Sequence, residues 1–143
     1  MPEKQRRSTA AQSARPGVAT GHRSYGVASA HRMPGGATVL PLRGEIDVLT
    51  APELTRRLDA LTGDPRPDLV LDLRPVDFID CAGLSALCRA RNRVLARRGR
   101  LRLVTDSVGF LRMLRVTGLR DVFEVHPRLP AHCAEAGAAG ARA

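Results

Sequence analysis

The sequence has very few aromatic side chains: they make up 3% of its 143 residues, tryptophan is absent, and Tyr25 is the single tyrosine. Proteins that bind single-stranded nucleic acids stack the bases on aromatic side chains, so this composition disfavours that class. Long hydrophobic runs are also missing. None approaches the roughly 20 residues of a membrane-spanning helix, and no apolar stretch follows the charged N-terminus as in a secretory signal. The sequence therefore predicts neither a membrane span nor secretion.

Cysteine is scarce as well. Three cysteines, Cys81, Cys88 and Cys133, are an odd number at wide spacing and predict no disulfide framework. On a helix, Cys81 and Cys88 would lie about 10 Å apart, too far for a disulfide. The four histidines have no metal-site spacing relative to the cysteines, so we expect no metal ion and no cofactor. Reduced thiols are typical of a cytoplasmic protein.

Basic residues exceed acidic ones by 23 to 14, which gives a net charge of +9. Residues 1–35 hold six basic residues against one acid, and residues 36–143 hold 17 arginines against 13 acids. The first segment is also rich in alanine, serine, glycine and proline. We therefore expect a disordered basic arm over residues 1–36, one domain over residues 37–133 and a flexible C-terminal tail over residues 134–143.

Apolar segments with strand and helix patterns alternate along the domain. Strands are predicted at residues 38–43, 68–73, 101–105 and 121–125, and helices at residues 51–62, 81–98, 108–117 and 129–133. Thr50, Asp80, and either Asp106 or Ser107 are the expected helix caps, and Leu84, Leu87, Val94 and Leu95 the expected inner stripe of the second helix. Pro41 argues against a central position for the first strand. The alternation predicts an α/β fold, with a mixed, mostly parallel sheet of about four to five strands packed by three to four helices.

Five motifs occur in order at suitable spacings. They are Gly44-Glu-Ile-Asp47, Leu69-Val-Leu-Asp-Leu73, Phe78-Ile-Asp-Cys-Ala-Gly-Leu84, Gly99-Arg-Leu-Arg-Leu-Val104 and Thr117-Gly-Leu119. Together they resemble the STAS domains of bacterial anti-sigma-factor antagonists, over about residues 38–128. The resemblance implies a single STAS-like domain.

The resemblance also implies a partner switch, in which the antagonist binds an anti-sigma factor, usually a serine kinase, and thereby frees a sigma factor. In that family the kinase phosphorylates a serine at the start of the second helix. The equivalent position here is Cys81, followed by Ala82, so both hydroxyls are missing. We therefore predict that phosphorylation at the usual site does not control this protein. Ser85 is a weaker alternative acceptor.

The resemblance implies a partner-binding surface and no catalytic residue. Its residues are Glu45, Asp47, Thr50, Asp80, Cys81, Ala82, Gly83 and Leu84. Without the resemblance, Glu45 and Asp47 are better interpreted as solvated loop charges than as a catalytic pair. Cys81 is either an inert filler or an oxidisable thiol at a helix N-terminus, an alternative that the neighbouring Asp80 carboxylate opposes.

Arginines recur every fourth residue along the second helix, at Arg89, Arg93 and Arg97. They predict a solvated outer face or, alternatively, a basic stripe that recognises an acidic partner or a phosphate. The favoured function is a non-enzymatic anti-sigma-factor antagonist. The alternative is a STAS-like scaffold subunit of a transport or stress-signalling complex. A nucleic-acid binder that uses the basic arm is a third possibility, but no reading helix or zinc finger supports it.

Overall fold

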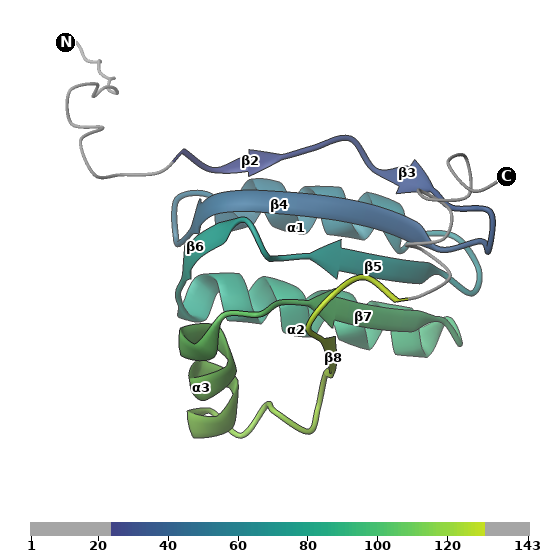
Figure 1. Ribbon diagram of the computed structural model, residues 1–143. Helices are drawn as coiled ribbons and strands as arrows, with labels where there is room; N and C mark the ends of the chain where they lie inside the picture. Colours follow the sequence, from purple (N-terminus) through teal and green to yellow (C-terminus); the bar gives the residue numbers. More distant parts are fainter. Residues whose placement is uncertain (1–23, 131–143) are drawn as a thin grey trace, which may run out of the picture.

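The computed structural model describes residues 24–130, which form one mixed sheet with three helices (Figure 1). The strands are β2 (Gly26–Val27), β3 (His31–Arg32), β4 (Thr38–Ile46), β5 (Asp68–Asp72), β6 (Val76–Ile79), β7 (Arg100–Val104) and β8 (Glu124–His126). The helices are α1 (Ala51–Leu61), α2 (Cys81–Ala96) and α3 (Val108–Val116).

The sheet is mostly parallel, which confirms the predicted fold class. Strands β4, β5, β7 and β8 are parallel neighbours in that order, whereas β2 and β3 pair antiparallel with the other edge of β4. The long strand β4 pairs with β5 through its first half and with β6 through its last three residues. The sheet has seven strands, more than expected, because β2, β3 and β6 are too short to show a periodic pattern.

The expected edge position of β4 is wrong, since β4 has strand neighbours on both sides. The carbonyl of Pro41 accepts a hydrogen bond from Ala28 N at 3.0 Å. The nitrogen of a strand residue faces the same side as its carbonyl, so the missing Pro41 donor faces this edge. There the neighbouring chain is interrupted between β2 and β3. The break in the short strands is what lets a proline occupy a central strand.

The expected boundary of the basic arm is also too late, because residues 24–36 contribute β2 and β3. Tyr25 and Val27 pack against the core, and burial raises the pKa of Tyr25 to about 12. The edge of β4 opposite β5 supplies the backbone hydrogen-bond partners of this segment. Residues 1–23 of the expected arm and the expected tail after residue 133 lie outside the described residues.

Helices α1 and α2 lie together on one face of the sheet, behind it in Figure 1. The core between the helices and the sheet contains fully buried leucines from both. They are Leu54 and Leu58 of α1, Leu87 of α2, and Leu40, Leu69, Leu71 and Leu103 of the strands. Leu95 was expected to face this core but is 50% exposed. Ala86 and Ala90 occupy the inner stripe of α2 in its place, because small residues allow the helix to approach the sheet closely. The opposite face carries a smaller cluster around Val39 and Val70, covered by Met33 and Leu129.

Arg89 and Arg93 of α2, and Arg97 just after it, bind α1 and the turn that follows α1, which neither sequence interpretation anticipated. Arg89 forms two 2.9 Å hydrogen bonds with the Asp59 carboxylate. Arg93 donates to Thr62 Oγ1 at 2.9 Å and to the Asp59 carbonyl at 3.1 Å, and Arg97 donates to the Gly63 carbonyl at 3.4 Å. The Arg89 guanidinium lowers the pKa of Asp59. These side chains join the two helices. Arg89 stays exposed, as a solvated outer face predicts, but its guanidinium is paired with Asp59, so the series is not an open basic stripe.

The remaining differences lie at the ends of elements. The last strand is β8, at Glu124–His126 rather than 121–125, because the chain still turns at Val122, whose N–H bonds the Leu119 carbonyl at 3.0 Å. Leu129 and Pro130 lie outside any helix, and residues 131–133 of that expected helix are not described. Ser107, not Asp106, caps α3 by accepting a hydrogen bond from Phe110 N at 3.1 Å.

Candidate functional site

The predicted site residues follow two strands that end side by side. Strands β4 and β6 are parallel, with Ile46 opposite Ile79, and Asp80 N donates to the Ile46 carbonyl at 3.1 Å. The loop after β4 and the first turn of α2 therefore emerge next to each other at the carboxyl end of the sheet. In open α/β sheets this edge is where ligands and partners are commonly bound.

Internal hydrogen bonds hold the Glu45–Thr50 loop in one conformation. Asp47 Oδ1 accepts from Leu49 N at 3.0 Å and from Thr50 N at 3.1 Å. Thr50 Oγ1 accepts from Asp47 N at 2.9 Å and donates to the Glu45 carbonyl at 3.1 Å. Thr50 precedes α1, but its side chain makes no capping bond, so the expected cap is wrong. Its hydroxyl bonds the backbone of the preceding loop instead of capping α1.

Asp80 caps α2, as predicted. Its Oδ1 accepts from Ala82 N at 2.9 Å and from Gly83 N at 3.1 Å. A cap of this kind contributes about 1 kcal/mol to stability. A Cβ atom at Gly83 would lie 2.5 Å from Ile79 Cγ1, so only glycine lets the first turn pack this closely on the strand. The start of α2 is thus fixed both by its cap and by its packing.

The eight predicted residues differ in their access to a partner. Cys81 is exposed, and five others are half-buried: Glu45, Asp47, Thr50, Asp80 and Ala82. Gly83 and Leu84 are buried, with Leu84 part of the core. These two support the surface from below and do not form it. Ser85 is exposed one turn after Cys81.

Three exposed apolar side chains at this edge are not among the eight residues predicted by name, although the predicted Glu45–Thr50 loop contains two of them. Leu49 is 84% exposed, Val48 is also exposed in the same loop, and Phe78 is 51% exposed on β6. Large exposed apolar side chains gathered at one edge are typical of an interaction surface. For Val48 and Leu49 the available signal was a pair of large apolar residues inside a polar loop. Phe78 gave none, because its position depends on the pairing of β6 with β4.

Comparison with known proteins assigns the family. Residues 30–132 match the family model of the STAS domain, which is most of the chain. The chain belongs to the STAS domain family. One relative is the anti-sigma-F factor antagonist RsfA of Mycobacterium tuberculosis, 33% identical over 94 residues that cover 64% of this chain and 73% of the relative. Another is the anti-sigma-B factor antagonist of Bacillus subtilis, 32% identical over 59% of this chain and 76% of the relative.

Solved structures agree with this assignment. The crystal structure of an anti-sigma factor antagonist from Mycobacterium paratuberculosis is 27% identical, covers 78% of this chain and 95% of its own, and superimposes with a TM-score of 0.66. The antagonist SpoIIAA in its unphosphorylated form is 14% identical, covers 83% of this chain and 98% of its own, and has a TM-score of 0.57. At that identity SpoIIAA shares the fold. The curated relatives place this STAS domain among the anti-sigma-factor antagonists.

The part of the carboxyl-end edge formed after β4, β6 and β7 is acidic although the chain is basic, whereas the exposed Arg128 follows β8. The turns after β4, β6 and β7 contain Asp47, Asp80 and Asp106, and no lysine or arginine. The turn after β5 contains Arg74, which forms two 2.9 Å hydrogen bonds with the Asp72 carboxylate. The edge therefore combines carboxylates with exposed apolar side chains.

Within residues 24–130 the STAS domain contains no group of three or more histidine, cysteine, aspartate or glutamate side chains that could hold a metal ion. No helix in this part of the chain has the length and apolar character needed to cross a membrane. Cys81 and Cys88 are free thiols, and Cys133 lies outside the described residues.

Proposed function

We propose that this STAS domain acts in the cytoplasm as a non-enzymatic anti-sigma-factor antagonist, and that its anti-sigma partner is of the serine-kinase type. The observation that carries the proposal is the exposed apolar group Val48, Leu49 and Phe78 beside the exposed first turn of α2. We call this group, together with Glu45, Asp47, Thr50 and Asp80–Ala82, the docking edge. The names of the curated relatives supply the class of partner.

The docking edge is preorganised for binding. The hydrogen bonds of Asp47 and Thr50 fix the loop that presents Leu49, and the Asp80 cap fixes the turn that presents Cys81. A partner that binds such a surface does not have to order it first, and this reduces the entropy cost of association. Apolar side chains among carboxylates suit a partner whose own surface has apolar groups bordered by basic ones.

Cys81 bears on how partner binding is regulated. It is exposed at the first turn of α2, where the resemblance implies a phosphorylated serine, and a thiol does not replace a serine hydroxyl as a substrate for a serine kinase. A phosphate here would add about −1.5 to −2 charges between Asp80 and the Asp47 loop and so oppose docking. We propose that phosphorylation at this position does not release the partner.

The binding test uses the full chain and a panel of purified anti-sigma factors encoded in the same genome, with the anti-sigma-F factor of Mycobacterium tuberculosis as a heterologous reference. We expect at least one member to bind in calorimetry and to release its sigma factor when this chain is added. If none of the panel binds, the proposed function is wrong. Recovery of the chain only within a transport complex would favour the scaffold alternative.

The regulatory claim is tested by incubating the chain with the bound kinase-type anti-sigma factor and ATP. Intact-mass analysis should show no added phosphate on the parent chain. Cys81→Ser restores the hydroxyl at an exposed position and should produce a substrate, with Cys88→Ser as the matched control because Cys88 is half-buried on the same helix. Phosphate on Ser85 of the parent chain would contradict the claim.

A further inference from the structure

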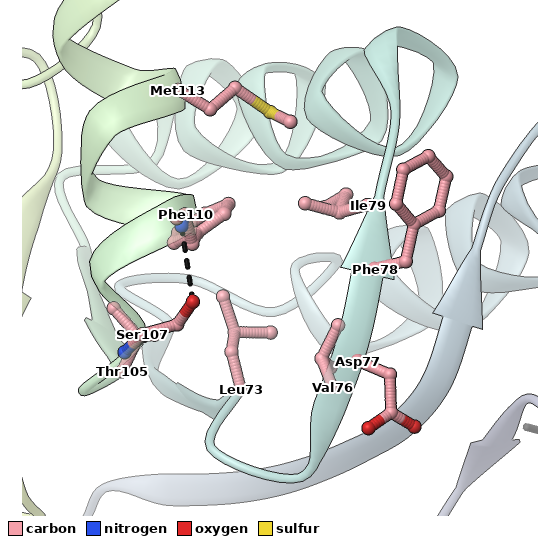
Figure 2. A pocket seen from close by; sticks show the side chains of 10 residues that line it. Leu73, Val76, Asp77, Phe78, Ile79, Thr105, Ser107, Phe110 and Met113 are labelled. Carbon is pink, nitrogen blue, oxygen red and sulfur yellow. Dashed lines mark hydrogen bonds between the residues drawn. The ribbon is translucent and has the colours of Figure 1, made fainter.

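An apolar cavity of about 250 Å³ opens between β6 and the start of α3 (Figure 2). Six apolar side chains line it: Leu73, Val76, Phe78, Ile79, Phe110 and Met113. Thr105 and Ser107 also line it, but their hydroxyl oxygens accept hydrogen bonds from Ser107 N at 3.2 Å and from Phe110 N at 3.1 Å. Figure 2 shows the Asp77 carboxylate turned away from the cavity. The space is therefore suited to an apolar group.

The sheet topology explains why the cavity exists. Strand β5 pairs with the first part of β4, and β6 pairs with its last part. In the described part of the chain β6 pairs with β4 alone. Strand β7 follows β5 and then leaves the sheet through Thr105 to enter α3. The far side of β6 consequently faces side chains of α3 instead of a neighbouring strand. The cavity lies in this split between β6 and α3.

The cavity is continuous with the docking edge. Phe78 belongs to both, since it lines the cavity and is half exposed beside the Glu45–Thr50 loop. Val108 extends the exposed apolar surface on the α3 side, next to Gly109, which also lines the cavity. A partner seated on Leu49 and Cys81 would therefore meet the cavity mouth.

Charge defines the surroundings of the mouth. Asp80 follows β6, and Asp106 is exposed just before α3. Arg74, the exposed base in the turn before β6, is paired with the Asp72 carboxylate, so the carboxylates of Asp80 and Asp106 remain beside the mouth. The surface of a complementary partner would place basic side chains around an apolar one, because like charges across an interface are unfavourable. Together, these observations define the kind of partner side chain that would fit the cavity: an apolar group with basic neighbours.

We propose that the cavity receives one apolar side chain of the anti-sigma factor, presented from a surface rich in lysine or arginine. An apolar cavity of about 150 Å³ can hold benzene, so this space is sufficient for a leucine, methionine or phenylalanine side chain. Buried apolar anchors of this kind dominate the affinity of protein interfaces. The proposal rests on the proposed function and adds to it the position and chemistry of the main contact.

The decisive variant is Gly109→Leu. A Cβ atom at Gly109 meets only Ser107 Oγ, at 3.8 Å, and leucine is a better helix former than glycine, so the variant is expected to fold. Its side chain would block the mouth. The matched control is Gly63→Leu, which adds the same group at an exposed turn after α1, at the opposite end of the sheet. Thermal unfolding of both variants verifies the fold.

Affinity for the anti-sigma factor that binds the parent chain is measured by calorimetry. We expect Gly109→Leu to weaken binding at least about tenfold and Gly63→Leu to change it less than about twofold. In methyl NMR of the parent chain, the Met113 resonance should shift when the anti-sigma factor is added. Equal affinity of Gly109→Leu and the parent, with an unmoved Met113 resonance, overturns the anchor and leaves the proposed function standing.

Two further outcomes separate the alternatives. Failure of the parent chain to bind any anti-sigma factor overturns the proposed function, and the anchor with it. A titration with toluene examines the other occupant, a free apolar molecule. If toluene moves the Met113 resonance while the anti-sigma factor binds without moving it, the cavity is a small-molecule site and the assignment to the partner is wrong.

Discussion

Two regions of this STAS domain use their charges in opposite ways. Along α2, the arginines Arg89, Arg93 and Arg97 bind oxygen atoms of α1 and of the turn that follows it. At the docking edge, by contrast, carboxylates and apolar side chains lie in the turns that follow the strands, and several of them are exposed. The basic residues of the helix pair thus bind other parts of the fold. The edge instead presents exposed apolar side chains beside carboxylates, of which Asp47 and Asp80 also accept hydrogen bonds from their own loop and helix.

This difference changes the meaning of the net charge of +9. An excess of arginine suggests a surface for nucleic acids or phosphates, yet the regular arginine series on α2 is hydrogen-bonded within the chain. The surface with the features of a binding site has the opposite local charge. Net charge describes the association behaviour of a whole chain, but the chemistry of a site depends on where each charge lies.

The largest expected effect comes from a charge introduced at the docking edge. Leu49→Asp replaces the most exposed apolar side chain of the edge with a carboxylate beside Asp47. We expect affinity for the anti-sigma factor to fall about 100-fold, because an apolar contact is lost and a charge is desolvated. The free energy of unfolding should change by less than about 0.5 kcal/mol, since Leu49 packs little. Calorimetry and urea unfolding measure the two quantities.

The matched control places the same change in the other region. Leu95 lies on the outer side of α2 among the arginines and is 50% exposed. Leu95→Asp should leave the affinity within about twofold of the parent. If it weakens binding as much as Leu49→Asp does, the partner surface extends over the helix pair and the contrast between the two regions fails.

An intermediate effect is expected where α2 binds α1. Thr62 is fully buried, and its Oγ1 donates to the Leu58 carbonyl at 2.8 Å and accepts from Arg93 Nε at 2.9 Å. Thr62→Val removes the acceptor and should lower the free energy of unfolding by about 1 kcal/mol, because Arg93 Nε loses this partner and keeps only the contact with Asp59 Oδ1 at 3.3 Å. Affinity for the anti-sigma factor should not change. Urea unfolding at pH 7 measures the difference.

Thr117→Val is the control for this substitution. Thr117 is also the residue after a helix, and its hydroxyl donates to the Met113 carbonyl at 2.8 Å, but it is exposed. Its loss should cost less than about 0.5 kcal/mol. An equal loss in the free energy of unfolding for the two variants would mean that the bond between Thr62 and Arg93 does not stabilise the packing of α1 against α2.

The sequence predicted most of the fold because its longer elements carry periodic apolar patterns. Strands β5 and β7 and all three helices follow these patterns closely, and the Asp80 cap sits in the expected place. Strands β2 and β3 have two residues each, which is too short for any period, and they form because they pair with the edge of β4 opposite β5. Their existence depends on tertiary structure, so local reasoning assigned them to the arm.

The docking edge was predicted in outline but not in its most exposed residues. The resemblance pointed to the loop after β4 and the start of α2, and the structure brings these together through the bond between Asp80 and Ile46. Leu84 was included although it is buried, and Phe78 was left out although it is exposed. A motif identifies which segments lie at a site. It does not tell which side of each segment faces solvent, because that depends on strand register and helix rotation.

The smallest expected effect is a pH dependence at the far edge of the sheet. The Arg100 guanidinium bonds Glu124, with Nε to Oε1 at 3.0 Å, and together with the His126 ring it lowers the pKa of Glu124 from 4.5 to about 2. A carboxyl group with a lowered pKa in the folded state stabilises the fold above pH 4.5, and this contribution is lost as the pH falls toward 2. Glu124→Gln should therefore destabilise the chain at pH 7, by less than about 1 kcal/mol because the pair is partly exposed, and its effect should be much smaller near pH 2.

Urea unfolding of parent and variant at pH 7, 4 and 2.5 tests this, with Asp121→Asn as the control because it removes the same charge from an exposed residue near Glu124. The difference between the parent and Glu124→Gln should shrink as the pH falls, and more steeply than the difference for Asp121→Asn. A difference that stays constant across the three pH values would show that Glu124 stabilises the sheet edge through packing and not through its charge. In that case the Arg100–Glu124 pair would differ from the Arg89–Asp59 pair of the two helices, in which the arginine also lowers the pKa of its carboxylate partner.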